Sequence, residues 1–226
     1  MRVLAIDTAL GACSAAVLDL NRGGITASET MAMTRGHAEA LLPLIARVMD
    51  LADVEFAGLD RIAVTTGPGS FTGLRVGLSA SRGIALAAGK PAIGLSTLAG
   101  FAAPLIADDD SSHVVAAIDA RHDNVYLQVF GTSGRTLVAP RIATLRDAVR
   151  AAMTGPARIV GSAADLLAAT WPKDADRPLA VEQLAAPDIG WIARLGAAAE
   201  GAGPPKPLYL RAPDAQPQDA ARLLRR

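Results

Sequence analysis

Two aspartates stand where predicted strands end, and they are the first candidates for chemistry. Asp7 and Thr8 follow the apolar run at 2–6, and Asp119 follows a second apolar run at 113–118. A carboxylate at such a position can orient a metal-bound water or a phosphate, and a neighbouring hydroxyl can donate to a phosphate oxygen. The alternative use is structural, because Asp side chains often accept hydrogen bonds from the backbone of their own turn.

The stretch VTTGPGSFTGLRVG at 64–77 runs from a predicted strand through a turn into a helix. Gly67 and Gly69 permit tight backbone geometry, and Ser70 is placed to cap the helix that follows. Free N–H groups at a helix start attract anions, so this turn is a candidate phosphate loop. It is not a Walker A loop, because the Gly-Lys-Ser/Thr ending is missing. A sharp strand-to-helix turn without a ligand is the alternative interpretation.

The remaining reactive residues form no recognisable catalytic set. His37, His113 and His122 lack the spacing of metal ligands. Cys13 is the only cysteine, which excludes an internal disulfide and is typical of a small core residue. Ser70 has no evident base close to it in the sequence, although a Ser–His pairing depends on the tertiary structure. We therefore predict no metal site and no resident cofactor.

The helix predicted after this turn carries small residues four positions apart. Gly73, Gly77, Ser81 and Ala85 form one smooth ridge, which permits close packing of a partner helix or of the chain's own sheet. Together with the apolar face of the preceding helix, this ridge predicts an apolar surface too large for a monomer. The predicted partner interface comprises Leu41, Leu44, Ile45, Val48, Gly73, Leu74, Gly77, Leu78, Ser81 and Arg82. We expect a leucine at Gly77 to block partner binding without unfolding the monomer.

Composition sets the class of protein. The chain has 226 residues, of which 51% are hydrophobic and 19% charged, so we expect a well-filled core in one large or two small domains. The formal net charge is zero, unlike the basic footprint of a protein that grips nucleic acid alone. Neither a signal peptide nor a clean membrane-spanning run is visible. These features predict a cytoplasmic protein that does not bind membranes.

The elements that must position these residues alternate between strand and helix. The first half predicts strands at 2–8, 13–20, 25–31, 60–67 and 91–95, with helices at 37–52, 70–89 and 96–107. This order indicates an α/β layer with a mixed sheet. After the polar run at 108–112, we predict strands at 113–120 and 124–131, a helix at 144–153, a strand leading into a helix at 157–167, a helix at 188–201 and an extended segment at 207–213. Both halves open with a strand that ends in aspartate, which suggests a duplicated fold.

Six stretches carry a family resemblance. They are LAIDTALGACSAAVLD at 4–19, TRGHAEALLPLI at 34–45, GPGSFTGLRVGLSASRGIALA at 67–87, GLSTLAGFA at 94–102, DARHDNVY at 119–126 and PLYLR at 207–211. Together they resemble the TsaB (YeaZ) family over nearly the whole chain, least clearly at 165–190. The resemblance implies an α/β fold of the actin-like, Hsp70-like ATPase (ASKHA) type, with two similar subdomains and mixed central sheets. It assigns 1–106 to the first subdomain, with 187–226 packing back on it, and 107–186 to a second, degenerate one.

The same resemblance implies a role in making N6-threonylcarbamoyladenosine in tRNA. In that system TsaD is the transferase, TsaE is an ATPase, and TsaB is the non-catalytic dimerisation subunit that binds and activates TsaD. The chain is then expected to form a homodimer alone, a heterodimer with TsaD and a larger complex with TsaE, and to meet tRNA only indirectly. Two alternatives remain: a nucleotide-dependent enzyme that uses Asp7 and Asp119 around magnesium, and a protease that acts on a paralogue.

Two positions separate this chain from TsaD. TsaD has a motif in which two histidines bind a catalytic metal, and the similar stretch here is GLSTLAGF at 94–101. Thr97 and Phe101 stand where those histidines would be, and a phenyl ring cannot ligate a metal. On this interpretation Asp7, Thr8, Gly67 and Gly69 are vestiges of the phosphate loops. Weak ATP or ADP contact at the partner junction is therefore expected.

Overall fold

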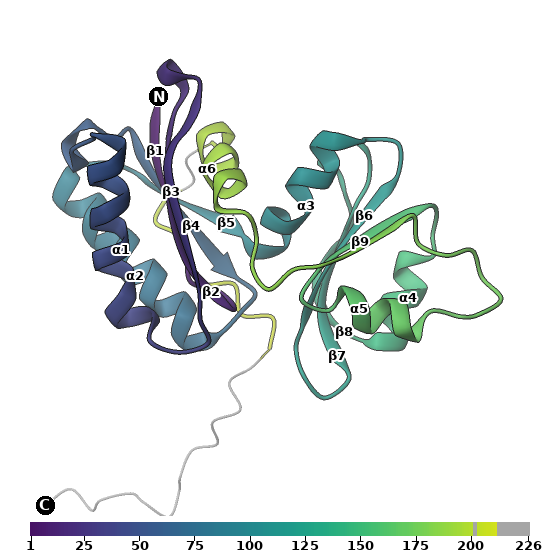
Figure 1. Cartoon of the computed structure of the whole chain (residues 1–226). Helices are drawn as coiled ribbons and strands as arrows, with labels where there is room; N and C mark the ends of the chain where they lie inside the picture. Colours follow the sequence, from purple (N-terminus) through teal and green to yellow (C-terminus); the bar gives the residue numbers. More distant parts are fainter. Residues whose placement is uncertain (201–202, 212–226) are drawn as a thin grey trace, which may run out of the picture.

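The chain folds as the same sequence of elements used twice. The computed structural model describes residues 1–200 and 203–211. The first half contains β1 (Arg2–Asp7), β2 (Ala12–Asp19), β3 (Gly24–Ala32), α1 (His37–Ala52), β4 (Arg61–Gly67), α2 (Phe71–Ala88), β5 (Ala92–Ser96) and α3 (Thr97–Asp108). The second half contains β6 (His113–Asp119), β7 (Asn124–Phe130), β8 (Thr136–Thr144), α4 (Leu145–Ala152), β9 (Ala157–Gly161), α5 (Ala164–Thr170), β10 (Ala180–Gln183) and α6 (Ile189–Ala198). Figure 1 shows the two halves side by side.

The two sheets share one topology. The first has the strand order β3-β2-β1-β4-β5, and the second, taken from its opposite edge, has the equivalent order β8-β7-β6-β9-β10. In each sheet the first three strands pair antiparallel as a meander. The last two strands of each sheet join in parallel, as expected for strands connected through a helix. The predicted architecture, two similar α/β subdomains with mixed central sheets, is confirmed.

Five layers build the core, and the two halves exchange their last helices. Helices α1 and α2 cover one face of the first sheet, and α4 and α5 cover the outer face of the second. Between the sheets, α6 packs on the first sheet through Ile189, Ile192 and Ala193, whereas α3 packs on the second through Leu98, Phe101 and Leu105. Gly100 of α3 allows Ile192 of α6 to approach closely, since an added Cβ there would lie 2.5 Å from Ile192 Cδ1. Each half therefore completes the core of the other.

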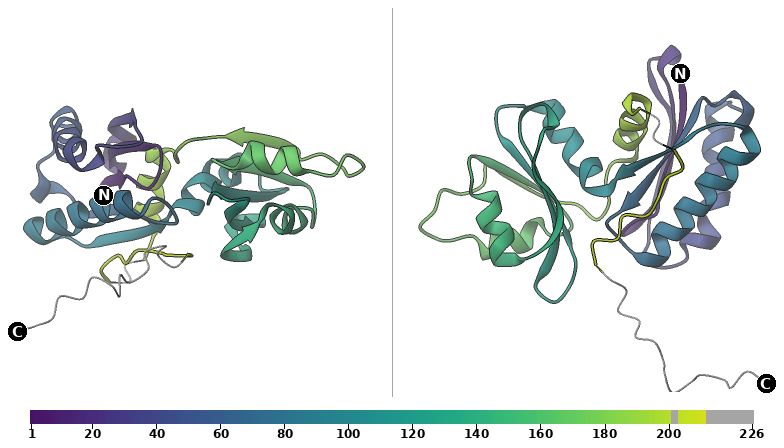
Figure 2. Two further views of the ribbon diagram at one scale, coloured as in Figure 1. Left: turned by 90° about the horizontal axis from the view of Figure 1, so that it is seen from below. Right: turned by 180° about the vertical axis from the view of Figure 1, so that it is seen from behind.

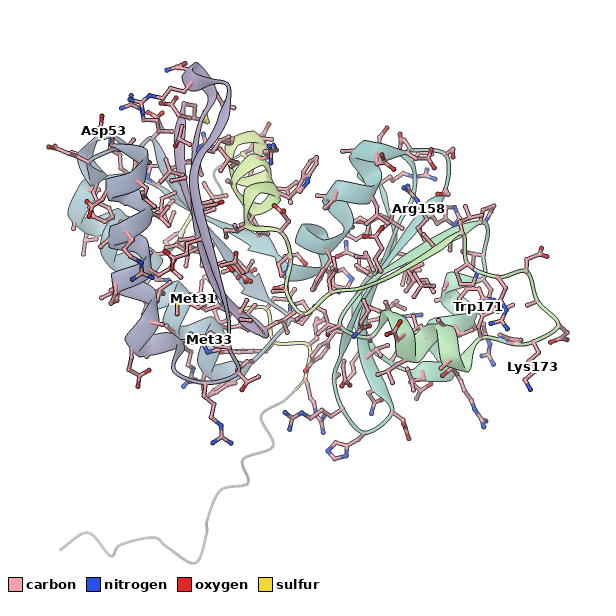
Figure 3. All side chains as sticks on the ribbon, viewed as in Figure 1. Met31, Met33, Asp53, Arg158, Trp171 and Lys173 are labelled. Atoms are coloured by element: carbon pink, nitrogen blue, oxygen red, sulfur yellow. The ribbon has the colours of Figure 1, made fainter. Side chains whose placement is uncertain are left out.

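The helices of the first half lie where their periodicity predicts them, but two strands of the second half were missed. Strand β8 contains Pro140, which cannot donate to a ladder and is tolerated because β8 is an edge strand with a register shift. Strand β10 is short, largely exposed and also at an edge, so it shows little apolar alternation. Trp171 lies at the base of the loop that leads to β10 (Figure 3). Edge strands of this kind carry the weakest sequence signal.

The last described segment crosses from one half to the other. Residues 203–211 run along β4 and α2, where Leu208 N–H donates to the Thr66 carbonyl at 2.8 Å, and Arg211 Nη1 reaches the Ala120 carbonyl at 3.3 Å (Figure 2). The proposed limits at 106 and 186 stay a prediction. The parts of the predicted 187–226 segment at 201–202 and 212–226 lie outside the described residues. No helix in the described ranges combines the length and apolar character that crossing a membrane requires.

Candidate functional site

The residues predicted to form a partner interface lie inside the chain's own core. Leu41, Leu44, Ile45, Val48, Gly73, Leu74, Gly77, Leu78 and Ser81 are all buried, and only Arg82 of the predicted set is exposed. The apolar stripes of α1 and α2 point at the first sheet, and side chains with less than a tenth of their area exposed offer little surface to a partner. These nine residues are therefore buried in the isolated chain, and their assignment to a partner interface stays a prediction, whereas the two helices do have an exposed face.

The glycine ridge of α2 packs against the turn after β1. A Cβ on Gly73 would overlap the Thr8 carbonyl oxygen, and one on Gly77 would lie 2.5 Å from Thr8 Oγ1. Thr8 Oγ1 also donates to the Gly73 carbonyl at 2.7 Å, a bond that only this close approach allows. The glycines are thus required by an intramolecular contact. A leucine at Gly77 would disrupt the fold, which corrects the expectation that it would leave the monomer intact.

The candidate phosphate loop is occupied by the chain itself. Gly67 adopts a φ of 113°, which an L side chain rarely does, and Gly69 leaves no space for a Cβ beside the Ala9 carbonyl. Ser70 N–H donates to that carbonyl at 2.7 Å, and Ser70 Oγ accepts from Gly73 N–H. Two donors at the start of α2, the N–H groups of Ser70 and Gly73, therefore serve the β1–β2 turn and the helix cap. This favours the interpretation of a sharp strand-to-helix turn.

Asp7 is buried at the centre of this turn. Its side chain is 0% exposed, and Oδ1 accepts from Thr65 Oγ1 and from Ala9 N–H. Within the described residues, Asp7 Oδ2 has no hydrogen-bond partner, and neither has Oγ of Ser14, which lies directly opposite in β2. Burial raises the pKa of the Asp7 carboxyl, and the hydrogen bond from Thr65 lowers it by a smaller amount. A fully buried carboxyl whose Oδ1 already accepts two hydrogen bonds is poorly accessible to a metal from solvent.

The other singled-out residues lie in structural positions, although within the described residues Thr97 Oγ1 and His113 Nδ1 have no hydrogen-bond partner. Asp119 caps its own turn, since Oδ1 accepts from Arg121 N–H at 2.7 Å. Thr97 and Phe101 are buried in α3. Burial raises the pKa of the Cys13 thiol to about 11, so this thiol is no nucleophile near neutral pH. His37 Nε2 lies 3.2 Å from the Leu10 carbonyl. No group of three or more His, Cys, Asp or Glu side chains that could hold a metal occurs in residues 1–200 and 203–211.

The exposed feature of α1 and α2 is a shallow groove between their outer faces, opposite the sheet. Its volume is about 500 Å³, and it is lined by Ala38, Leu41, Leu42, Phe71, Thr72, Arg75, Val76, Ser79 and Ala80. Leu42 is 59% exposed and Phe71 43%. Apart from Leu41, these lining residues were not predicted from the sequence, because they fall outside the main apolar stripe. Leu42 and Phe71 could have been found from the sequence, because each is an apolar side chain on the polar side of an amphipathic helix.

Comparison with known proteins identifies the family. The family model described as "TsaD: tRNA N6-adenosine threonylcarbamoyltransferase" matches residues 21–185. The tRNA threonylcarbamoyladenosine biosynthesis protein TsaB of Escherichia coli K12 is 39% identical over 126 residues, which cover 56% of this chain and 53% of that protein. The match thus spans about half the length of this relative. A protein of Mycobacterium tuberculosis H37Rv described as uncharacterized is 32% identical over 217 residues, covering 95% of this chain and 94% of its own length.

Solved structures agree with this relationship. A Pseudomonas aeruginosa protein described as similar to the peptidase YeaZ superposes with a TM-score of 0.78 at 29% identity, covering 93% of this chain and 99% of that one. YeaZ from the same organism gives a TM-score of 0.74 at 28% identity, covering 92% and 99%. The chain belongs to the TsaD family. Within that family it is a member of the TsaB (YeaZ) group.

Proposed function

We propose that this chain is a non-catalytic subunit in the synthesis of threonylcarbamoyladenosine in tRNA, and that it binds and activates a TsaD-type transferase. It docks through the outer face of α1 and α2. The observation that carries the proposal is the exposed groove there, since Leu42 and Phe71 expose apolar surface beside each other in a member of the TsaB group. In isolation, a second copy of the chain occupies the same face as a homodimer.

The closed turn after β1 supports the non-catalytic part of the proposal. The Ala9 carbonyl accepts the Ser70 N–H that a phosphate oxygen at the start of α2 could otherwise accept, and Asp7 is fully buried. A nucleotide-dependent enzyme would need this turn open. We propose that ATP or ADP contacts the chain only weakly and only at the partner junction, that a TsaE-type ATPase joins the larger complex, and that tRNA reaches this chain through its partners.

The experiment is light scattering on a sizing column with this protein alone, with the TsaD-type transferase of the same organism, and with both plus MgATP. We expect a homodimer alone and a one-to-one or higher complex in the mixture. Leu42→Asp places a charge in the groove and is expected to weaken association with the transferase by about tenfold or more. Leu179→Asp is the matched control, because Leu179 is 63% exposed but lies before β10 in the second half.

The experiment distinguishes an error in the docking surface from an error in the scaffold function. If Leu42→Asp associates as tightly as the wild type, the surface is wrong while the scaffold function stands. If the wild-type protein and the transferase elute independently with and without MgATP, the scaffold function itself is wrong. Thermal unfolding of each variant identifies any loss that comes from misfolding.

A further inference from the structure

A cluster of one arginine and two aromatic rings stands at the end of the groove. The Arg75 guanidinium carbon lies 3.8 Å from the centroid of the Phe71 ring, one helical turn earlier in α2. The Phe71 ring contacts the Tyr209 ring, with centroids 5.4 Å apart. Arg75 Nε donates to Tyr209 Oη at 3.4 Å, which joins the helix to the last described segment. The three side chains therefore form one stacked unit built from two distant parts of the chain.

The cluster is held in place from both sides. Phe71 occupies the first position of α2, directly after the Ser70 cap, so its backbone is fixed by the helix start. On the other side, the hydrogen bond from Leu208 to Thr66 attaches the residue before Tyr209 to β4. The guanidinium is thus presented in a defined orientation. Less side-chain entropy is lost when a partner binds a group that is already ordered.

The charge of Arg75 is left uncompensated. Within residues 1–200 and 203–211, no carboxylate lies within 4.0 Å of its guanidinium. Arg47 of the neighbouring helix α1 differs, since it forms an ion pair with Glu29 at 2.6 Å. The Arg75 side chain is also exposed, and Phe71 and Tyr209 each expose 43% of their area. An ordered, exposed and unpaired arginine on an aromatic base is the composition typical of binding hot spots.

We propose that Arg75 recognises a carboxylate on the partner helix that docks in the groove. The inference rests on the proposed function, because Phe71 and Arg75 themselves line the groove between α1 and α2. The partner is a helix with an apolar residue for the groove and an Asp or Glu about one turn away. A guanidinium is planar and can bind both oxygens of a carboxylate at once, whereas an ammonium cannot. Tyr209 is a positioning residue that orients the guanidinium.

The test measures affinity for the TsaD-type transferase by calorimetry at several salt concentrations. Arg75→Gln is expected to weaken binding by about tenfold and to flatten its salt dependence. Arg75→Lys keeps the charge and should recover only part of the affinity, because the planar fork is lost. Tyr209→Phe retains the ring but removes the hydroxyl, and a smaller loss is expected. Arg146→Gln on α4 is the matched control, an exposed arginine in the second half for which no partner is found among the described residues.

The outcomes separate this inference from the docking surface itself. If Arg75→Gln binds as the wild type while Leu42→Asp loses binding, the groove is right and the carboxylate recognition is wrong. If neither change matters, the docking surface fails. Cation–aromatic clusters also stack on nucleobases, so the isolated chain is titrated with an anticodon stem-loop RNA as well. Binding of that RNA by the wild type, lost in Arg75→Gln, would overturn the assignment to a protein carboxylate.

Discussion

Asp7 has a structural role at a position where a carboxylate could also bind a phosphate or a metal. It stands at the end of β1, where a carboxylate can serve a phosphate or a metal, yet it is fully buried and bonded to Thr65 and Ala9. Its second oxygen has no partner among the described residues. Burying an unpaired polar atom costs about 1–3 kcal/mol, and more when it is charged. The surroundings therefore favour the protonated form of this carboxyl.

The raised pKa of Asp7 makes stability depend on pH. The folded state retains a proton that the unfolded chain, with the ordinary pKa of 3.8, has already released. The free energy of unfolding therefore falls as pH rises from the unfolded pKa through the folded one. Asp7→Asn stays neutral, so as the pH rises above about 4 we expect it to lose less stability than the wild type, by about 1–3 kcal/mol.

Urea denaturation at a series of pH values measures this difference, with Asp174→Asn as the control. Asp174 is exposed and makes no hydrogen bond or ion pair within the described part of the chain. Parallel pH profiles of the wild type and Asp7→Asn would show that Asp7 ionises in the folded protein at its ordinary pKa. The control variant should follow the wild type throughout.

At the scale of elements, α2 shows why a helix tolerates glycines at regular spacing. Gly73 and Gly77 lie on the face that meets the β1–β2 turn, where a methyl group has no space beside Thr8. Gly83 lies in the same helix, with nothing within 4 Å of the position of an added Cβ. The close approach brings the helix start to the turn and closes the space a phosphate would fill. The outer face of the same helix takes no part in this contact and lines the groove.

This contrast predicts opposite effects of the same substitution within one helix. Gly73→Ala is expected to destabilise the protein by about 1–3 kcal/mol, because the methyl group overlaps a backbone carbonyl. Gly83→Ala should stabilise it by about 0.5–1 kcal/mol, since alanine loses less backbone entropy in a helix. Chemical denaturation of both variants measures the pair. Equal changes in the two variants would contradict the packing of α2 against Thr8.

At the scale of the whole molecule, the exchange of α3 and α6 joins the two halves into one cooperative unit. Each helix completes the core of the sheet to which it does not belong in the chain, and Gly100 and Ile192 form their contact. The segment at 203–211 adds a second connection, from Thr66 and α2 to Ala120. Without the other half, each sheet would keep the helices on its outer face but lose the helix that covers its inner face.

Unfolding is therefore expected to be a single transition. In a Trp191→Phe background, fluorescence reports Trp171 of the second half, and far-UV circular dichroism reports both halves. The two curves should coincide in urea, and Ile192→Ala should shift both by the same amount, for a loss of about 2–5 kcal/mol. If Ile192→Ala leaves the urea midpoint of Trp171 fluorescence unchanged while the circular dichroism curve shows two transitions, the halves unfold separately.

Local patterns were sufficient for much of the first half. The period of 3.6 predicted α1 over 37–52, which the structure has at the same residues. The two strands that end in aspartate indicated the duplication that the sheet topology shows. Strands β8 and β10 were missed because a proline and solvent exposure remove the alternation that identifies a strand.

The sequence by itself determined the family, the fold class and which helices have an apolar side. It did not determine what those sides face, because burial against the chain's own sheet and burial against a partner select the same residues. Only the tertiary structure showed that the stripes of α1 and α2 are core, and that Leu42, Phe71 and Arg75 form the outer surface. The closed turn at Ala9 and the contact between Arg75 and Tyr209 also depend on residues far apart in the chain. Such contacts have no local signature, since chain folding alone brings the partners together.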